Sequence, residues 1–177
     1  MAKVLDTLTR EQIDWVNSQK IFFVATAPVS DTGHINCSPK GGNSFRLISS
    51  KEFVYADFTG SGVETIAHIL DNQRICVMFC SFDIHPKIFR FHGEGIVIPE
   101  NHIEFNSFKT LISERIGIRA FIKIKINRIT SMCGLQVPNF SYIGEKDGLL
   151  NWENEKGLSG LQNYRKSKNN KSIDGIS

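Results

Sequence analysis

The chain has 177 residues, of which 41% are hydrophobic, and its 21 basic and 18 acidic side chains give a net charge of +3. This length and composition predict one globular domain, because a chain of this size can bury a substantial core. No apolar run approaches the roughly 20 residues of a membrane span, and no basic-flanked apolar leader is present. We therefore expect a cytoplasmic protein with no membrane partner.

The excess of positive charge is concentrated at the C-terminus. Residues 164–177 hold four basic side chains and one acidic side chain, which leaves the body, residues 1–163, without net charge. A short basic tail is usually a solvated terminus, and no stripe of aromatic and basic residues supports nucleic-acid binding. We expect a single domain at 1–163 followed by a basic tail, and keep contact of Arg165–Lys171 with nucleic acid as a weaker alternative.

The four cysteines are Cys37, Cys76, Cys80 and Cys133, and no two of them form a C-x-x-C pair. This spacing argues against a structural metal site and favours free thiols in a reducing compartment. Cys76 and Cys80 lie in an apolar run and are expected to be small core residues. Cys133 precedes Gly134, which leaves two readings open, a reactive thiol or a tight turn.

The first third of the chain is predicted to form one helix and four strands. Thr9 and Gln12 fit a capping box, which predicts a helix over residues 10–18. Runs rich in β-branched and aromatic residues predict two strand pairs. These strands are expected at 21–26, 34–38, 45–48 and 52–58.

The remainder is predicted to hold further strands at 74–80, 88–98 and 118–126, with helices at 62–71, after Pro99 and around Trp152–Tyr164. In the last strand every second residue is apolar, which indicates one face in the core, while Arg119, Lys123 and Lys125 indicate a face in water. About six strands with few helices predict a mainly β fold of the α+β kind. A six-stranded antiparallel split β-barrel with peripheral helices fits best, since curling a sheet into a barrel reduces its exposed edges.

A glycine-rich loop joins the strand that ends at Phe58 to the next helix. Ser61 and Glu64 fit a capping box, so Ser61 is the predicted N-cap. Gly60 and Gly62 let a ligand approach the backbone, and a helix N-terminus favours an anion such as phosphate. A plain turn remains the alternative, because the loop lacks the lysine of a P-loop and the spacing of a dinucleotide-binding loop.

A second candidate segment interrupts the strand that begins near residue 34. Lys40 lies between Pro39 and Gly41, and the proline should be at a sheet edge or a bulge. A lysine beside open backbone is a candidate contact for an anionic or carbonyl-bearing ligand, although the segment can equally be only a loop.

Five segments then occur in a characteristic order. They are Ser38-Pro39-Lys40-Gly41, Tyr55-x-Asp57-x-Thr59-Gly60-Ser61-Gly62-x-Glu64-Thr65-Ile66-Ala67-His68, Arg74-Ile75-x-x-Met78-Phe79-Cys80, Pro86-x-Ile88-x-Arg90-x-x-Gly93 and Cys133-Gly134-x-x-Val137-Pro138. In this order the chain resembles the pyridoxamine 5'-phosphate oxidase-like superfamily, the FMN-binding split barrels. Ser172-Ile173-Asp174-Gly175 is similar to the C-terminal signature of one subgroup of small proteins in that superfamily.

The resemblance implies a homodimer with FMN in a groove at the subunit interface. It places the FMN phosphate against the glycine-rich loop, beside the hydroxyls of Thr59 and Ser61, and places Ser38 and Lys40 beside the flavin. It also implies that the tail can fold onto the dimer. The implied cofactor-binding residues are Ser38, Lys40, Asp57, Thr59, Gly60, Ser61, Gly62, Thr65 and Arg90, with no metal and no assigned catalytic residue.

The loop departs from the oxidase pattern at one point. The oxidase carries an arginine and lysine pair where this chain has Gly62-Val63, so Lys40, Arg74, Arg90 or a residue of the other subunit must balance the phosphate charge. The expected function is a flavoprotein, an FMN-dependent oxidoreductase with an unassigned substrate. The alternative is a non-catalytic binding module that holds FMN, haem or a phosphorylated metabolite.

Overall fold

The computed structural model describes residues 3–176, and positions 1, 2 and 177 of the expected domain and tail lie outside the described residues. Within this range the chain forms eight strands and four helices. In order they are β1 (Lys3–Leu5), α1 (Arg10–Ser18), β2 (Ile21–Thr26), β3 (Asn36–Gly41), β4 (Phe45–Ser49), β5 (Glu52–Phe58), α2 (Glu64–Asn72), β6 (Arg74–Cys80), β7 (Ile88–Pro99), α3 (Phe105–Ile112), β8 (Ile118–Met132) and α4 (Gly148–Lys168).

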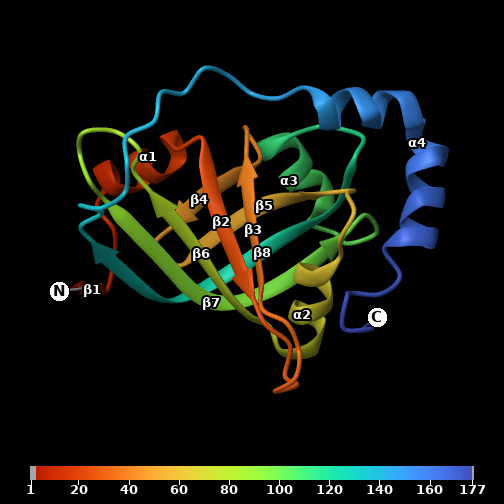
Figure 1. Ribbon diagram of the computed structural model, residues 1–177, viewed down its shortest axis with the longest axis horizontal. Coiled ribbons are helices and arrows are strands. Elements are labelled where there is room, and N and C mark those ends of the chain that lie inside the picture. Colours follow the sequence, from red (N-terminus) through yellow and green to blue (C-terminus); the bar gives the residue numbers. More distant parts are fainter. Residues whose placement is uncertain (1–2, 177) are drawn as a thin grey trace.

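The strands form one antiparallel sheet in the order β3-β2-β6-β7-β8-β5-β4, with β1 also paired to β8. The sheet curls into a half-barrel whose edge strands, β3 and β4, belong to opposite ends of this order (Figure 1). The predicted split barrel is therefore confirmed, with eight strands rather than six. The short strand β1 was not predicted, because three residues carry too little pattern to be recognised.

Aromatic side chains fill the inside of the half-barrel. Phe22 of β2 lies at the centre of this cluster, with its ring 4.9 Å from that of Phe45 and 5.4 Å from that of Phe79. A second, smaller core lies between the sheet and α3, where the rings of Phe105 and Phe121 are 5.2 Å apart. The prediction that one face of the last strand lies in water is thus wrong for its first half, because α3 covers that face.

The N-terminal helix is as predicted, and its capping box between Thr9 and Gln12 is present in both directions. The helix expected after Pro99 begins later, at Phe105, because Pro99 still pairs with Ala120 as the last residue of β7. Ile103, which an earlier helix start would include, lies before the helix and is 92% exposed.

The C-terminal part of the chain covers one side of the half-barrel. After β8, residues 133–147 cross the top of the sheet in the view of Figure 1 and lead into α4, which bends at Gly157. This helix continues to Lys168, beyond the expected domain boundary at residue 163. Among residues 3–176 no helix has the length and apolarity needed to cross a lipid bilayer.

Candidate functional site

A groove of about 1270 Å³ lies between β3, the loop after β5, and residues 140–150 of the C-terminal part. Eight of the nine predicted cofactor-binding residues line it, from both candidate segments. They are Ser38, Lys40, Asp57, Thr59, Gly60, Ser61, Gly62 and Thr65. The two segments that the sequence singled out independently therefore form one site.

Arg90 is the predicted site residue that does not line the groove. It lies on β7, in register with Met78 and Thr130, and its guanidinium is 2.7 Å from the sulfur of Met132. Arg74, the other arginine expected to balance a phosphate, instead donates to Asn72 and to the Pro28 carbonyl. Neither arginine supplies charge to the groove.

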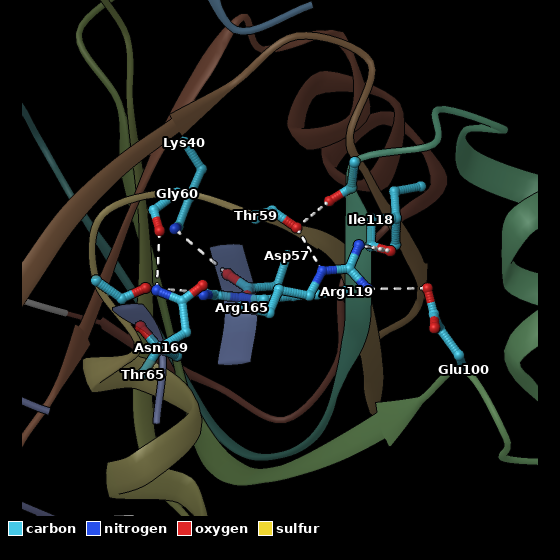
Figure 2. A network of polar contacts seen from close by, with 12 residues as sticks. Lys40, Asp57, Thr59, Gly60, Thr65, Glu100, Ile118, Arg119, Arg165 and Asn169 are labelled. Atoms are coloured by element: carbon cyan, nitrogen blue, oxygen red, sulfur yellow. Dashed lines mark hydrogen bonds and ion pairs between the residues drawn. The ribbon is translucent and has the colours of Figure 1, made fainter. Parts of the chain in front are cut away.

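The positive charge at the groove comes from Arg119, which was predicted to lie on the solvent-facing side of its strand. Its Nε donates to the Asp57 carboxylate at 2.6 Å (Figure 2), and its Nη2 donates to the Gly62 carbonyl at 2.8 Å. The Lys40 ammonium lies 3.6 Å from the other Asp57 oxygen. Two cations therefore share one carboxylate that is only 1% exposed, which leaves one positive charge in excess among these three side chains.

The sequence contains one clue that a cation must lie here, the acidic residue Asp57 within an apolar strand. Asp57 occupies a strand whose other residues are almost all apolar, and a buried carboxylate requires a cationic partner. Asp57 pairs with Ala120 in the sheet, so Arg119 is the neighbouring residue on β8. Without knowledge of the register between the two strands, the partner could not be selected.

The loop after β5 has a different conformation from the one predicted. The N-cap of α2 is Val63, with no side-chain cap, rather than Ser61. In a helix capped by Ser61, the Gly62 carbonyl would accept a hydrogen bond from a backbone amide one turn later. Because this carbonyl instead accepts from Arg119, the helix begins at Glu64.

Backbone amides of this loop lack a hydrogen-bond partner in the part of the chain that the structure describes. Within residues 3–176, the amides of residues 60–63 donate no hydrogen bond; Gly60, Ser61 and Gly62 line the groove, Val63 is buried outside its lining, and the Ser61 side chain is exposed. The Glu64 carboxylate folds back against Gly62, where a side chain on that glycine would overlap with it. Free amides at a helix N-terminus, next to Arg119 and Lys40, form a site suited to an anion.

Thr59 has a structural role in place of the expected contact with phosphate. Its hydroxyl donates to the Gly117 carbonyl at 2.9 Å and accepts from Arg165 at 2.7 Å. The residue is fully buried, so the Thr59 side chain fixes the base of the loop. Ser61 is the loop hydroxyl that remains exposed.

A cluster of polar side chains from β2, β3 and α2 lies beside the groove. Asn36 donates to the hydroxyls of Thr26 and Thr65, and Thr26 is 3.0 Å from Nδ1 of the buried His68. Burial raises the pKa of Tyr55, the nearest phenol, well above its ordinary value. These contacts tie Thr65 and the start of α2 to the edge of the sheet, so Thr65 presents an already bonded hydroxyl to the groove.

The far wall of the groove comes from the segment before α4. The amide of Phe140 donates to the Phe82 carbonyl, and the Lys20 ammonium lies 5.6 Å from the centre of the Tyr142 ring. At the other end of the wall, Arg115 forms a two-point ion pair with the fully buried Glu153, at 2.7 and 3.0 Å. The chain therefore closes one side of the groove with its own C-terminal part.

The cysteines lie outside this groove. Burial raises the pKa of both Cys76 and Cys80. Cys80 is buried as predicted, whereas Cys76 is only half-buried and lies outside the core clusters. Cys133 is exposed next to a tight turn in which the Val137 amide donates to the Gly134 carbonyl. Among the described residues, no group of three or more His, Cys, Asp or Glu side chains is arranged to hold a metal ion.

The fold defines a split-barrel protein with a groove at a strand-loop-helix turn. The sequence model of the family described as pyridoxamine 5'-phosphate oxidase matches residues 8–133. The pyridoxamine 5'-phosphate oxidase family protein ustO of Aspergillus flavus is 39% identical over 137 residues, which cover 75% of this chain and 55% of that protein. The chain therefore belongs to the pyridoxamine 5'-phosphate oxidase family, and it spans about half the length of this relative.

Solved structures share the same fold. HupZ from Group A Streptococcus matches with a TM-score of 0.58 and 24% identity, over 76% of this chain and 100% of that chain. An FAD-binding protein of Mesorhizobium loti matches with a TM-score of 0.52 and 13% identity, over 74% of this chain and 95% of that chain. A protein of the pyridoxinephosphate oxidase family from Clostridium acetobutylicum matches with a TM-score of 0.54 and 15% identity, over 71% of this chain and 88% of that chain.

Proposed function

We propose that this protein is a flavoprotein that binds FMN in the groove, with the phosphate at the loop formed by residues 60–63. The observation that carries the proposal is the free Ser61 amide, which lines the groove close to the buried Arg119. One terminal nitrogen of Arg119 has no hydrogen-bond partner within residues 3–176. A buried guanidinium that lacks a partner is expected to contact a ligand or an ordered water, and phosphate is a good acceptor for it.

The size of the groove supports a cofactor together with a second molecule. Its volume of about 1270 Å³ exceeds the ~300–1,000 Å³ of a typical small-molecule site. Ser38 and Lys40 of β3 lie on one side and the aromatic residues Phe140 and Tyr142 on the other. We assign Lys40 to the phosphate, the rest of the β3 side to the flavin ring, and the C-terminal wall to the substrate.

Within this proposal, bound FMN supplies the electron-transfer chemistry, and the protein positions it. Lys40 and Arg119 balance the phosphate charge, the loop amides donate to its oxygens, and the C-terminal wall limits access of water. The protein is then an FMN-dependent oxidoreductase whose substrate is not assigned. A homodimer with FMN at its interface and a cytoplasmic location remain predictions.

A non-catalytic binding module is the second candidate, and one feature of the groove favours it. The charged side chains at its floor are paired with one another, Asp57 with Arg119 and Arg115 with Glu153. None of them is free to act as a general acid or base. Such a module would hold FMN, haem or a phosphorylated metabolite without turnover.

The first experiment is an absorption spectrum of the purified protein, followed by parallel titrations with FMN and riboflavin, which differ only in the phosphate. We expect saturable FMN binding and weaker riboflavin binding. Replacing Lys40 with Met should weaken FMN binding about tenfold, as for loss of one contact with a charged group, and leave riboflavin binding unchanged. Lys87→Met is the matched control, since Lys87 lies over Trp15 away from the groove.

A protein that binds neither ligand would overturn the proposal. If FMN binds, addition of NADH or NADPH under anaerobic conditions distinguishes the two candidate functions. Loss of the visible flavin band would support an oxidoreductase. A band that persists with both nicotinamide donors, yet bleaches with dithionite, would support the binding module.

A further inference from the structure

The segment after residue 164 holds the glycine-rich loop through two side chains. The Asn169 amide donates to the Gly60 carbonyl at 2.9 Å (Figure 2). Arg165 donates to the Thr59 hydroxyl at 2.7 Å, to the Ile118 carbonyl at 3.2 Å and to Glu100 at 3.0 Å. Both side chains lie beyond residue 133, where the match to the family ends.

The contact with Gly60 determines where the next amide points. No peptide bond in the described chain is cis, and in a trans peptide the carbonyl and the following N–H point in opposite directions. When Asn169 holds the Gly60 carbonyl on its own side, the Ser61 N–H must face the other way. Arg119 fixes the Val63 N–H in the same manner by holding the Gly62 carbonyl.

Such a restraint matters at this loop because glycine on both sides of Ser61 gives the backbone unusual freedom. Ligand binding to a mobile loop carries the entropic cost of ordering it, and a loop already held in the binding conformation avoids that cost. Arg165 acts at the base of the loop, because it donates to the Thr59 hydroxyl. The hydroxyl and the amide of Thr59 both donate to the Gly117 carbonyl.

Unpartnered buried atoms gather at the same place. Five buried side-chain polar atoms lack a hydrogen-bond partner among residues 3–176, and three of them belong to Asp57, Arg119 and Asn169. Of these three atoms, Nη1 of Arg119 is the donor that a bound phosphate can satisfy, whereas the Asp57 and Asn169 atoms are acceptor oxygens and the Asp57 oxygen faces Lys40 at 3.6 Å.

We infer that Asn169 and Arg165 are positioning residues for the bound phosphate: from the C-terminal segment, Asn169 orients the Ser61 amide and Arg165 fixes the base of the loop. This inference rests on the proposed function, because it specifies how the same site is arranged. Neither residue contacts the phosphate: Asn169 acts through the Gly60 carbonyl and Arg165 through the Thr59 hydroxyl.

The test compares Asn169→Ala and Arg165→Ala with the wild-type protein in titrations with FMN and with riboflavin. Each variant should bind FMN about three- to tenfold more weakly, the effect of one lost hydrogen bond, and riboflavin as well as the wild type does. Arg165→Lys keeps the positive charge but lacks the planar guanidinium with its several donors, so its FMN affinity should fall nearly as far as that of Arg165→Ala. Asn163→Ala and Lys166→Ala, at exposed positions of the same helix, are the matched controls.

Amide NMR resonances of Ser61 and Val63 give a second measurement, with inorganic phosphate as the probe. A shift of the Ser61 amide in the wild type that is lost in Asn169→Ala supports the inference, and the Val63 amide, which Arg119 orients, is the internal reference. If FMN does not bind but this phosphate shift occurs, the flavin assignment fails and the positioning role stands. Equal losses of FMN and riboflavin affinity would show a merely structural role, and an unchanged FMN affinity in both alanine variants would overturn the inference.

Discussion

At the scale of single residues, the buried pair of Asp57 and Arg119 carries the greatest energetic consequence. The carboxylate is 1% exposed and the arginine side chain 10% exposed, so both ions are held away from water. The pair is stable because each ion satisfies the other and Lys40 adds a second positive charge. Removal of one partner leaves an uncompensated buried charge.

Arg119→Met should therefore destabilise the protein by about 3 kcal/mol, at the lower end of the range for a broken buried pair because Lys40 remains. The double variant Asp57→Asn with Arg119→Met removes both charges and should recover at least half of this loss. Urea unfolding of the two variants and the wild type measures the difference. A double variant no more stable than Arg119→Met would show that charge burial is not the cause.

This pair also shows what the sequence can reveal about a site and what it cannot. Lys40 and Asp57 were identified because they lie in recognisable short segments. Arg119 lies in a strand where alternation separates two faces, but alternation does not say what covers each face. The face with Arg119 and Phe121 is covered by α3 and by the loop after β5, which depends on contacts far apart in the chain.

At the scale of elements, the start of α2 is set by a tertiary contact that overrides a local pattern. The Ser61 and Glu64 spacing fits a capping box, yet Arg119 captures the Gly62 carbonyl and moves the N-cap to Val63. Glu64 then becomes the first residue of the helix, where its negative charge stabilises the helix dipole. The same charge repels an anion at the loop.

Glu64→Gln should consequently strengthen FMN binding by about two- to fivefold, the effect of removing one partly exposed like charge. Riboflavin binding should not change. Stability should fall by up to about 1 kcal/mol through the lost dipole interaction. Glu11→Gln, in the first turn of α1, serves as the control: it should share the stability effect and leave FMN binding unchanged, and an FMN effect in both variants would contradict the local explanation.

The attachment of α4 depends on a glycine in the turn before β8. A side chain at Gly117 would overlap with the carboxylate of Glu153, the residue that pairs with Arg115. Gly117→Ala should displace Glu153 and destabilise the protein by about 1–3 kcal/mol, as for other overpacked buried sites. Thermal unfolding measures this loss, and Gly148→Ala in the same helix, where the space is open, should change stability by no more than about 0.5 kcal/mol.

At the scale of the whole molecule, the sheet was more predictable than the C-terminal part. Apart from β3, strands β2 to β8 have strong period-two or continuous apolar patterns, so their existence and the split barrel follow from local sequence. β3 (Asn36–Gly41) has no apolar pattern and extends through Pro39 to Gly41, where an interruption was predicted. The role of residues 140–176 does not, because it rests on single polar contacts between distant positions. Phe140 with Phe82, Glu153 with Arg115 and Asn169 with Gly60 each join residues that no periodicity relates.

A further long-range contact joins His34 to Asp174, and it makes attachment of the tail depend on pH. Asp174 accepts from the His34 amide at 2.8 Å and lies 2.6 Å from Nδ1 of that ring. These bonds, with a smaller contribution from His68, hold the pKa of Asp174 below its ordinary value. The contribution of this contact to tail attachment is therefore complete above the pKa of the Asp174 carboxyl in the unfolded state, about 4, and is lost as the pH falls through the lowered value in the folded state.

Hydrogen exchange of the His34 amide, corrected for its intrinsic rate, should show protection at about pH 6 that declines once the pH falls below about 4. Asp174→Asn cannot ionise, so its protection should not vary across this range; a pH dependence equal to that of the wild type would mean that another group controls the tail.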